Sequence, residues 1–223
     1  VDLSYLHPLQ MLAQEHSKRL VNPPAVLTLL SEKTLATRTP GLTPKSIVSS
    51  QAAHLTQFLK REKDVVLKPL HTAQSKGVIR ISLDQSPEEN AKTLEAATEG
   101  FVRPVLLQKF VPQILKQGET RLWFVDGKLI AHAQKLPAKG EFRIDMDQGG
   151  SLRKTSLSAR NKARTQLISK ILRQHKIRMA AVDWIDGLVT DFNFTSPGLI
   201  VGMEKVLGQE LAPKIIRALQ KRN

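Results

Sequence analysis

The sequence predicts an α+β fold built largely on antiparallel sheet. Short apolar runs occur in pairs around turn dipeptides such as Asp126-Gly127 and Asp186-Gly187, and such pairs are typical of hairpins. Segments with apolar residues at helical spacing lie between these pairs, so helices and hairpins mix along the chain. The 223 residues are 41% hydrophobic and 24% charged, which is enough for a core in one large or two small domains.

The helices are predicted from apolar spacing and from residues that suit helix ends. Leucines at helical spacing run through 3–18, and Val21-Asn22-Pro23-Pro24 ends that helix. Ser50 and Ser86 suit N-caps, and Pro87 suits the first helical position after its cap. The predicted helices are 3–18, 25–37, a helix from the Ser50 cap to about 61, 87–99, 158–175 and 208–219.

The strands are predicted from short apolar runs that are bounded by residues disfavouring regular structure. A linker rich in such residues, 39–44, precedes the first strand. Two polar stretches, 71–76 and 137–152, are predicted as loops, and the second of them is expected to be mobile. The predicted strands are 46–48, 64–70, 78–81, 105–112, 120–125 and 128–135, followed by a hairpin within 179–197.

The last hairpin carries the main chemical signal. A three-residue loop, 186–188, would pair Ile185 with Val189 and set Asp183 opposite Asp191, whereas a regular two-residue turn would separate the two carboxylates. The longer loop is preferred because register follows the face that can be buried. The face it gathers comprises Val182, Trp184, Thr190, Phe192 and Phe194.

The opposite face of this hairpin would then hold Asp183, Asp191 and Asn193. Facing carboxylates repel, and Mg²⁺ would remove that repulsion because carboxylate and amide oxygens are its preferred ligands. The alternative is a hairpin with solvated acids on its wet face. Under the metal hypothesis, Asp183→Asn is expected to weaken Mg²⁺-dependent nucleotide binding and to leave the fold intact.

Composition restricts the partners. A net charge of +14 and a pI near 10.2 favour anionic partners such as nucleotide phosphates, nucleic acid or acidic lipid. Aromatic residues make up only 4% of the chain, which argues against stacking on single-stranded nucleic acid. No apolar run approaches about 18 residues, the start lacks signal-peptide features, and no cysteine is present for disulfides. The lack of cysteine does not identify a compartment, and a cytoplasmic location is our expectation. The missing initiator Met indicates a fragment, a processed chain or a beginning outside the given sequence.

Several residues are candidates for an anionic site, each with a plain structural alternative. Lys68 ends a buried strand just before a loop, where its ammonium could reach a phosphate or simply mark the strand end. Arg121 and Arg143 lie in a hairpin and a loop, where surface roles are common. Gln108 to Val111 could present a strand edge to a purine or be an ordinary sheet strand. No Walker or Gly-x-Gly-x-x-Gly loop occurs, and the six histidines lack metal-ligand spacing.

These candidates also follow one another in a recognisable order. The order is Lys33, Leu67-Lys68-Pro69-Leu70, Gln108-Lys109-Phe110-Val111-Pro112, Arg121 with Val125-Asp126-Gly127, Gly140-Glu141-Phe142-Arg143 with Gly149-Gly150, Asp183, and Asp191-Phe192-Asn193-Phe194-Thr195-Ser196-Pro197. It closely resembles the ATP-grasp part of bacterial glutathione synthetase, from about 21 to 207. The final Asp-x-Asn-x-Thr-Ser-Pro segment is distinctive, because related ligases usually vary there.

The resemblance implies an ATP-grasp fold, in which two α+β lobes with largely antiparallel sheets clasp ATP. By this resemblance 1–41 is a remnant of an N-terminal substrate domain with a linker, 42–107 is the small lobe and 108–223 is the large lobe with the metal site. The residues it assigns are Lys33, Lys68, Gln108, Lys109, Phe110 and Val111 to ATP, Asp183, Asp191 and Asn193 to Mg²⁺ (or Mn²⁺), and Arg121 and Arg143 to the reacting groups. The implied reaction joins γ-glutamylcysteine to glycine through an acyl phosphate.

This sequence also departs from the family pattern. The loop from His71 to Gly77 has one glycine where the family has several, so fewer of its amides can turn towards a phosphate; Lys76 could compensate as a point charge. Gln117 stands near the expected ribose position, where the family usually has an acid. Asp191 replaces the usual Glu, and most of the first domain is absent.

Three functions follow from these observations. The first is a glutathione synthetase-like ligase with small-molecule substrates, namely a dipeptide or amino-acid carboxylate and an amine. The second is a degenerate ATP-grasp domain that binds nucleotide or a partner without catalysis, which the glycine-poor loop favours. The third is a basic nucleic-acid-binding module, which only the net charge favours. We expect no nucleic-acid or membrane partner, and a homo-oligomer is left open.

Overall fold

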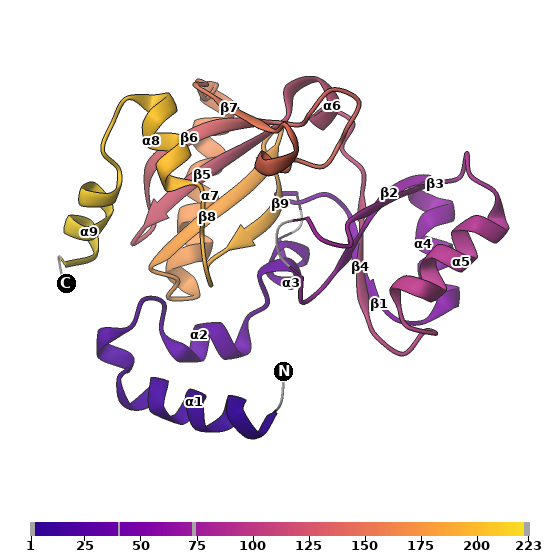
Figure 1. The fold of residues 1–223 in the computed structure, drawn as a ribbon, viewed down its shortest axis with the longest axis horizontal. Helices are drawn as coiled ribbons and strands as arrows, with labels where there is room; N and C mark the ends of the chain where they lie inside the picture. Colours follow the sequence, from indigo (N-terminus) through magenta and orange to yellow (C-terminus); the bar gives the residue numbers. More distant parts are fainter. Residues whose placement is uncertain (1–2, 40, 73–74, 221–223) are drawn as a thin grey trace.

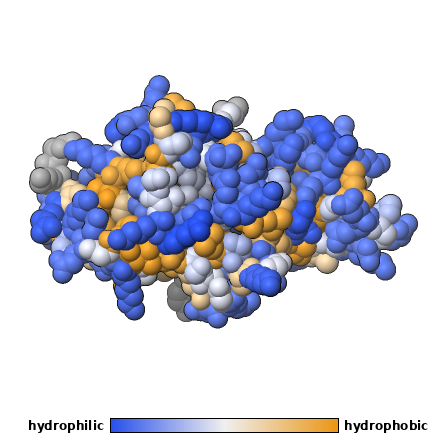
Figure 2. Space-filling model, turned by 90° about the horizontal axis from the view of Figure 1, so that it is seen from above, coloured by the Kyte–Doolittle hydropathy of each residue, from blue (hydrophilic) through white to orange (hydrophobic). Residues whose placement is uncertain are grey.

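The computed structural model describes residues 3–39, 41–72 and 75–220, which form two antiparallel sheets with helices around them (Figure 1). The four-stranded sheet has the order β1-β4-β2-β3 and the five-stranded sheet the order β7-β6-β5-β8-β9. The α+β class predicted from the sequence is therefore confirmed. Within the described ranges, no helix has both the length and the apolar character needed to cross a membrane. The face seen in Figure 2 is mostly hydrophilic, with hydrophobic atoms confined to patches.

The four-stranded sheet and the two helices packed on it are called the small lobe. Its elements are β1 (Ser46–Ser49), α4 (Ala52–Glu62), β2 (Asp64–Pro69), β3 (Ile79–Ser82), α5 (Pro87–Ala97) and β4 (Val105–Lys109). Leu55 and Phe58 of α4 and Leu94 of α5 pack with strand residues in one buried cluster. The predicted cap of α5 is confirmed, because Ser86 accepts from Glu89 N and the Glu89 carboxylate accepts from Ser86 N. The predicted Ser50 cap is wrong, since α4 begins after Gln51.

The five-stranded sheet and the helices on its two faces are called the large lobe. Its elements are β5 (Glu119–Val125), β6 (Lys128–Leu136), β7 (Ser151–Arg153), α7 (Ala159–Gln174), β8 (Met179–Ile185), β9 (Leu188–Asn193), α8 (Ile200–Leu207) and α9 (Ala212–Gln220). Ile168 and Leu172 of α7 pack with Phe124 on one face. Met203 of α8 and Ile215 of α9 pack with Trp123 on the other. Successive residues of β5 thus enter two different cores, as the pleat of a strand requires.

The β8–β9 hairpin brings its two aspartates together by a route that differs from the prediction. Its turn is the two-residue Asp186-Gly187, both with positive φ, and Ile185 pairs with Leu188; the predicted three-residue loop is therefore wrong. A bulge in β9 then shifts the register by one residue, so that Asp183 faces Asp191 as predicted. A two-residue turn with φ > 0 at both positions suits the twist of a hairpin. The bulge then brings Asp183 opposite Asp191.

The bulge residue is Thr190, and it does not join the apolar face as the sequence predicted. Its hydroxyl lies 3.1 Å from Glu119 Oε2 and 3.2 Å from Asp183 O. Val189 takes the apolar position instead and is fully buried. The other predicted members of that face lie in the same core cluster: Val182, Trp184, Phe192 and Phe194.

The remaining differences concern short or weakly marked elements. The predicted helix 25–37 is two helices, α2 (Pro24–Leu29) and α3 (Glu32–Thr37), because Leu30 is extended and the Ser31 side chain caps α3. The first predicted helix is observed as α1 (Leu3–Glu15). The elements not predicted are the 3-10 turns η1 (Ser17–Arg19) and η2 (Met146–Gln148), α6 (Ile114–Gln117), β7 and α8. The segment predicted as loop 137–152 thus contains η2 and the start of β7.

Candidate functional site

A cleft of about 830 Å³ lies between the two lobes, a volume within the range of small-molecule sites. The predicted site residues among those that line it are Lys33, Lys68, Lys76, Gln108, Lys109, Phe110, Val111, Arg121, Arg143, Asp183, Asp191 and Asn193. Gln117 is different. It is exposed on α6, where its backbone O accepts from Gln134 Nε2, and it is not among the lining residues. The structure therefore gives no support to a ribose contact by Gln117.

Asp183 is held by a buried bidentate ion pair. Arg121 Nε lies 2.9 Å from Asp183 Oδ1, and Arg121 Nη2 lies 2.6 Å from Oδ2. Lys135 Nζ also contacts Oδ2 at 3.1 Å, and all three side chains are at most 11% exposed. Burial alone would raise the pKa of Asp183, but Arg121 and Lys135 outweigh it and hold that pKa well below its ordinary value. The carboxyl group is therefore ionised, and both of its oxygens already accept hydrogen bonds.

Sequence reasoning missed two members of this charge network, Lys135 and Glu119. Lys135 on β6 forms ion pairs with both Glu119 and Asp183, and Glu119 accepts from the Thr190 hydroxyl. Glu119 and Lys135 are paired residues at the open end of the β5–β6 hairpin. Their pairing depends on a bulge between Trp123 and Phe124, and Glu119 lies outside the predicted strand 120–125, so the sequence pattern carried no direct signal of this pair. The cleft thus holds a buried network of two acids and two cations, with Asp191 beside it.

Asp191 differs from Asp183 because one of its oxygens has no partner. Its Oδ1 is buried without a hydrogen bond, while Oδ2 lies 3.9 Å from Lys33 Nζ. An ionised oxygen in this state is unfavourable unless a cation or donor reaches it. The donor set therefore fits a cation at Asp191. Within the described ranges, no group of three or more His, Cys, Asp or Glu could hold a metal by itself, so such a cation would take other ligands from a bound molecule.

Asn193 lies on the same strand as Asp191, and its side chain contacts β8. Its Nδ2 donates to Ala181 O at 3.1 Å and to Asp183 Oδ2 at 3.2 Å. The amide nitrogen is thus committed to β8. This contact fixes the side chain of Asn193 next to the carboxylate of Asp183 at the end of β9.

Two lysines connect the small lobe to the large lobe across the cleft. Lys68, partly buried on β2, donates to Gln108 Oε1 at 3.0 Å and to Thr190 O at 2.9 Å. Burial lowers the pKa of Lys68, although Asp191 and Glu119 act in the opposite direction. Lys33 on α3 donates to Thr72 O at 3.0 Å. Both ammonium groups therefore face the same end of the cleft as Asp191.

The other end of the cleft is apolar. Phe110, Val111, Ile114 and Ile185 form a buried cluster, against which Phe142 packs edge to face with its ring centroid 6.1 Å from that of Phe110. This wall can cover a flat ring. The N–H groups of Lys109 and Phe110 already donate to Lys45 O and Asp64 O, so contacts to a purine edge from this stretch would come from other groups.

The two remaining predicted residues lie at the rim. Arg143 is about half exposed, and its guanidinium is 3.8 Å from the Glu141 carboxylate, a loose pairing that leaves it free to contact a ligand. Lys76 is exposed in the loop that follows β2. Ala73 and Gln74 of the same loop lie outside the described residues.

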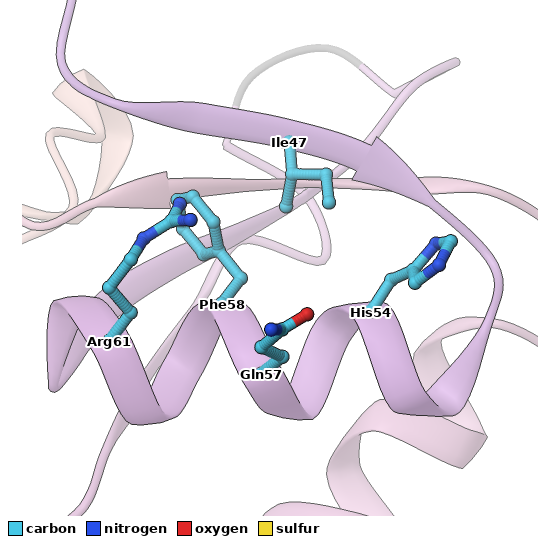
Figure 3. Close-up of a pocket in the computed structure, with 5 residues that line it drawn as sticks. All are labelled: Ile47, His54, Gln57, Phe58 and Arg61. Carbon is cyan, nitrogen blue, oxygen red and sulfur yellow. The ribbon is translucent and has the colours of Figure 1, made fainter.

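A smaller hollow of about 200 Å³ lies between α4 and β1 on the small lobe. Figure 3 shows His54, Gln57, Phe58 and Arg61 projecting from α4 and Ile47 from β1. The Arg61 guanidinium lies 5.0 Å from the centre of the Phe58 ring and also pairs with Glu62. None of the predicted site residues lines this hollow, so the acid and base groups that suit chemistry lie in the inter-lobe cleft.

Comparison with known proteins agrees with this geometry. Residues 32–208 match the family described as prokaryotic glutathione synthetase, ATP-grasp domain. The glutathione synthetase of Prochlorococcus marinus strain MIT 9313 is 31% identical over 221 residues, which is 98% of this chain and 71% of the relative. The glutathione synthetase of Agrobacterium fabrum is 28% identical over 99% of this chain and 69% of the relative.

Solved structures show the same fold at lower identity. The D-cycloserine synthetase DcsG has a TM-score of 0.70 and 18% identity, covering 97% of this chain and 80% of its own. The ATP-grasp ligase PsnB, solved with a precursor variant, Mg and ADP, has a TM-score of 0.63 and 14% identity, covering 89% of this chain and 60% of its own.

The solved structures show that the fold is that of ATP-grasp proteins, and the family match together with the curated relatives defines the class of this protein as an ATP-grasp ligase. Within that class, the chain belongs to the prokaryotic glutathione synthetase family, whose ATP-grasp domain covers most of its length.

Proposed function

We propose that the protein is an ATP-dependent carboxylate–amine ligase of the glutathione synthetase type, which joins γ-glutamylcysteine to glycine through an acyl phosphate. The observation that carries the proposal is the partnerless, buried Oδ1 of Asp191 in a cleft that also holds the ammonium groups of Lys33 and Lys68. A carboxylate oxygen that lacks a partner can take a metal ion, and the two nearby ammonium groups suit the phosphates that such a metal would carry. The family and fold support the same reaction class.

In this proposal the ATP phosphates lie at the end of the cleft near Asp191, where Lys33 and Lys68 face them. The adenine lies against the apolar wall at Phe110 and Val111. The predicted boundary between residues 107 and 108 falls inside β4 (Val105–Lys109), so the division between the two lobes is assigned after Lys109. The side chains of the 108–111 stretch, including Gln108 and Lys109, line the cleft on the way from the wall to the phosphates.

Mg²⁺ (or Mn²⁺) would be held by Asp191 and Asn193 together with phosphate oxygens. Asp183, the third ligand predicted from the sequence, reaches a metal only when Lys135 or Asn193 releases its Oδ2. When bound, the metal would offset charge on the transferred phosphoryl group. Arg121 and Lys135 offset the charge of Asp183 within the protein itself.

The reaction would proceed in two displacements. A carboxylate oxygen of the dipeptide attacks the γ-phosphorus of ATP and ADP leaves. The glycine amine then attacks the acyl carbon, phosphate leaves with the former carboxylate oxygen, and the amine loses a proton. Arg143, with its loose pairing to Glu141, is free to offset charge on the acyl phosphate. Arg121 would contribute indirectly, by holding Asp183 in place, because its guanidinium is committed to that carboxylate.

The loop after β2 would have to close over the ATP phosphates in this proposal. A ligase of this type must exclude water, or the acyl phosphate is hydrolysed. In this loop Ser75 has φ +57° and Gly77 has φ +71°, so a residue with a Cβ adopts a conformation that favours glycine. We infer that coupling is slow or leaky, and that Lys76 supplies some of the phosphate contact that additional glycines would give.

Lys76→Ala is expected to raise the KM for ATP about tenfold, because removing one charged phosphate contact corresponds to about 1.4 kcal/mol. Ser75→Gly is expected to raise the amount of peptide product formed per ADP. Lys92→Ala, at an exposed position on α5 away from the cleft, is the matched control. For all three variants, initial rates with ATP, γ-glutamylcysteine and glycine give the KM for ATP and the amount of peptide product per ADP. The loop argument is wrong if Lys76→Ala matches Lys92→Ala and Ser75→Gly leaves coupling unchanged.

The second candidate, a domain that binds nucleotide without catalysis, is favoured by the same loop. It predicts Mg²⁺-dependent ATP binding in the wild type but no ADP release when the dipeptide and glycine are added. The ligase predicts release that requires the dipeptide. Measuring ADP release with ATP alone, with the dipeptide, and with both substrates therefore separates the two functions.

A further inference from the structure

The N-terminal region supplies hydrogen bonds to the chain just beyond the proposed metal residues. Glu32, the first residue of α3, accepts with Oε1 from Phe194 N and Thr195 N, both at 2.6 Å. These two N–H groups directly follow Asn193, the last residue of β9 and the last to pair with β8. In Figure 1, α3 lies beside β9 and between the two sheets. Glu32 Oε1 thus accepts the two backbone hydrogen bonds that follow the end of the strand pairing.

A second side chain holds the same segment from its other side. Asn22 is 1% exposed, and its Nδ2 donates to Phe194 O at 2.7 Å and to Met179 O at 2.8 Å. Its Oδ1 accepts from Arg178 N and Met179 N. Phe194 is therefore fixed at its carbonyl by Asn22 and at its N–H by Glu32. The backbone after β9 has little freedom to shift while both contacts hold.

The residue after Glu32 extends the connection to the small lobe. Lys33 donates to Thr72 O in the loop after β2 and lies 3.9 Å from Asp191 Oδ2. Two adjacent residues of α3 thus contact the end of β9 and the start of the loop. Because α3 is only six residues long, these contacts set the spacing between the loop and the two residues Asp191 and Asn193.

We propose that Glu32 is a positioning residue for the metal and phosphate end of the cleft. Its carboxylate fixes the backbone after Asn193, and through that backbone it sets the direction of the Asp191 and Asn193 side chains. Glu32 has no contact with the reacting groups in this role. The inference rests on the proposed function, since it assigns Glu32 to the same Mg²⁺·ATP site.

The role can be separated from general stability because the chain contains a matched contact. Glu204 in α8 accepts with Oε1 from Leu211 N at 2.6 Å and Ala212 N at 2.8 Å. It is the same residue type, bonded to two successive N–H groups, and it does not line the cleft. If losing such a contact affects only stability, Glu32→Ala and Glu204→Ala should have similar effects.

The experiment compares Glu32→Ala, Glu32→Gln and Glu204→Ala in two assays. Amide hydrogen exchange without ligand should show faster exchange at residues 194 and 195 in Glu32→Ala, and at 211 and 212 in Glu204→Ala. Calorimetric titration of ATP at a series of Mg²⁺ concentrations should show the midpoint for Mg²⁺ raised about tenfold in Glu32→Ala only, an effect typical of residues that orient metal ligands. Glu32→Gln keeps the Oε1 acceptor and should stay within about twofold of the wild type.

The outcomes distinguish this inference from the proposed function. If the wild type binds ATP with a clear dependence on Mg²⁺ and Glu32→Ala has the same midpoint as Glu204→Ala, Glu32 is structural only and the inference is overturned. If the wild type shows no Mg²⁺-dependent binding, the proposed function fails first. Should Glu32→Ala not fold, Glu32→Asp withdraws the carboxylate by one methylene, and it must raise the midpoint for the inference to hold.

Discussion

Asp183→Asn is expected to lower the free energy of unfolding by about 3–5 kcal/mol, because removing one partner of a buried ion pair leaves the other charges uncompensated. Arg121 would lose its carboxylate and Lys135 would keep only Glu119, and both cations are almost fully buried. The hairpin register alone predicts that this substitution leaves the fold intact. The buried charge network reverses that expectation, and chemical denaturation measures the difference.

The matched control is Asp126→Asn. Asp126 forms a bidentate pair of similar geometry with Arg178, at 2.8 and 3.0 Å, but both side chains are about one third exposed. Asn also tolerates the positive φ of this turn position. Exposed pairs contribute at most about 1 kcal/mol, so Asp126→Asn should have a small effect. Equal losses for the two variants would contradict the account of Asp183.

The contribution of Asp183 should also depend on pH in a defined direction. Its pKa is lowered in the folded state, so the unfolded chain binds the proton more readily. The stabilisation is therefore complete above the unfolded pKa of about 3.9 and is lost as the pH falls below it. The stability gap between the wild type and Asp183→Asn should be constant from pH 7 to pH 5 and should narrow towards pH 3. A gap that widens on acidification would contradict this.

Asp191→Asn is expected to lower Mg²⁺-dependent ADP release about a hundredfold, because the ligand charge at the metal is removed and several kcal/mol of transition-state stabilisation are lost with it. Stability should change by less than about 1 kcal/mol, or increase, because the partnerless Oδ1 is an unfavourable group in the unliganded protein. Initial rates and denaturation curves on the same preparations measure both effects. Activity and stability should therefore separate at Asp191, unlike at Asp183.

Two further variants test whether Asp191 acts as a metal ligand. Asp147→Asn removes an exposed carboxylate that also lines the cleft, and it should leave the rate within about twofold if Asp191 acts as a ligand rather than through net charge. Asp191→Glu introduces the longer acid expected from the family pattern and should keep Mg²⁺-dependent release. A hundredfold loss in Asp147→Asn, or full activity in Asp191→Asn, would remove Asp191 from the metal site.

The hairpin shows how much of this site could be predicted from the sequence. Two facing aspartates follow from the need to bury Val182, Trp184 and Phe192 on one face, and the structure confirms them. The predicted loop length was wrong because a bulge at Thr190 performs the same correction. A bulge depends on local contacts such as that with Glu119, which the hydrophobic pattern does not record.

The contacts that the sequence did not reveal join residues far apart in the chain. Lys135 reaches Asp183 from another strand, and Glu32 reaches Phe194 across 162 positions. Such pairs leave no periodic trace, because each residue alone is an ordinary charged side chain near the end of an element. Gln117 shows the opposite case, since a place assigned by motif order proved to be exposed outside the cleft.

In the proposed reaction, the cleft makes an acyl phosphate from a carboxylate and ATP. Transfer of ¹⁸O tests it most directly. The wild type is incubated with Mg²⁺, ATP, glycine and γ-glutamylcysteine labelled with ¹⁸O in its cysteinyl carboxylate, and the released phosphate is analysed by mass spectrometry. The account predicts one labelled oxygen in each phosphate, because the attacking carboxylate oxygen leaves with phosphorus. Phosphate that carries no label, released at the same rate without the dipeptide, would contradict it.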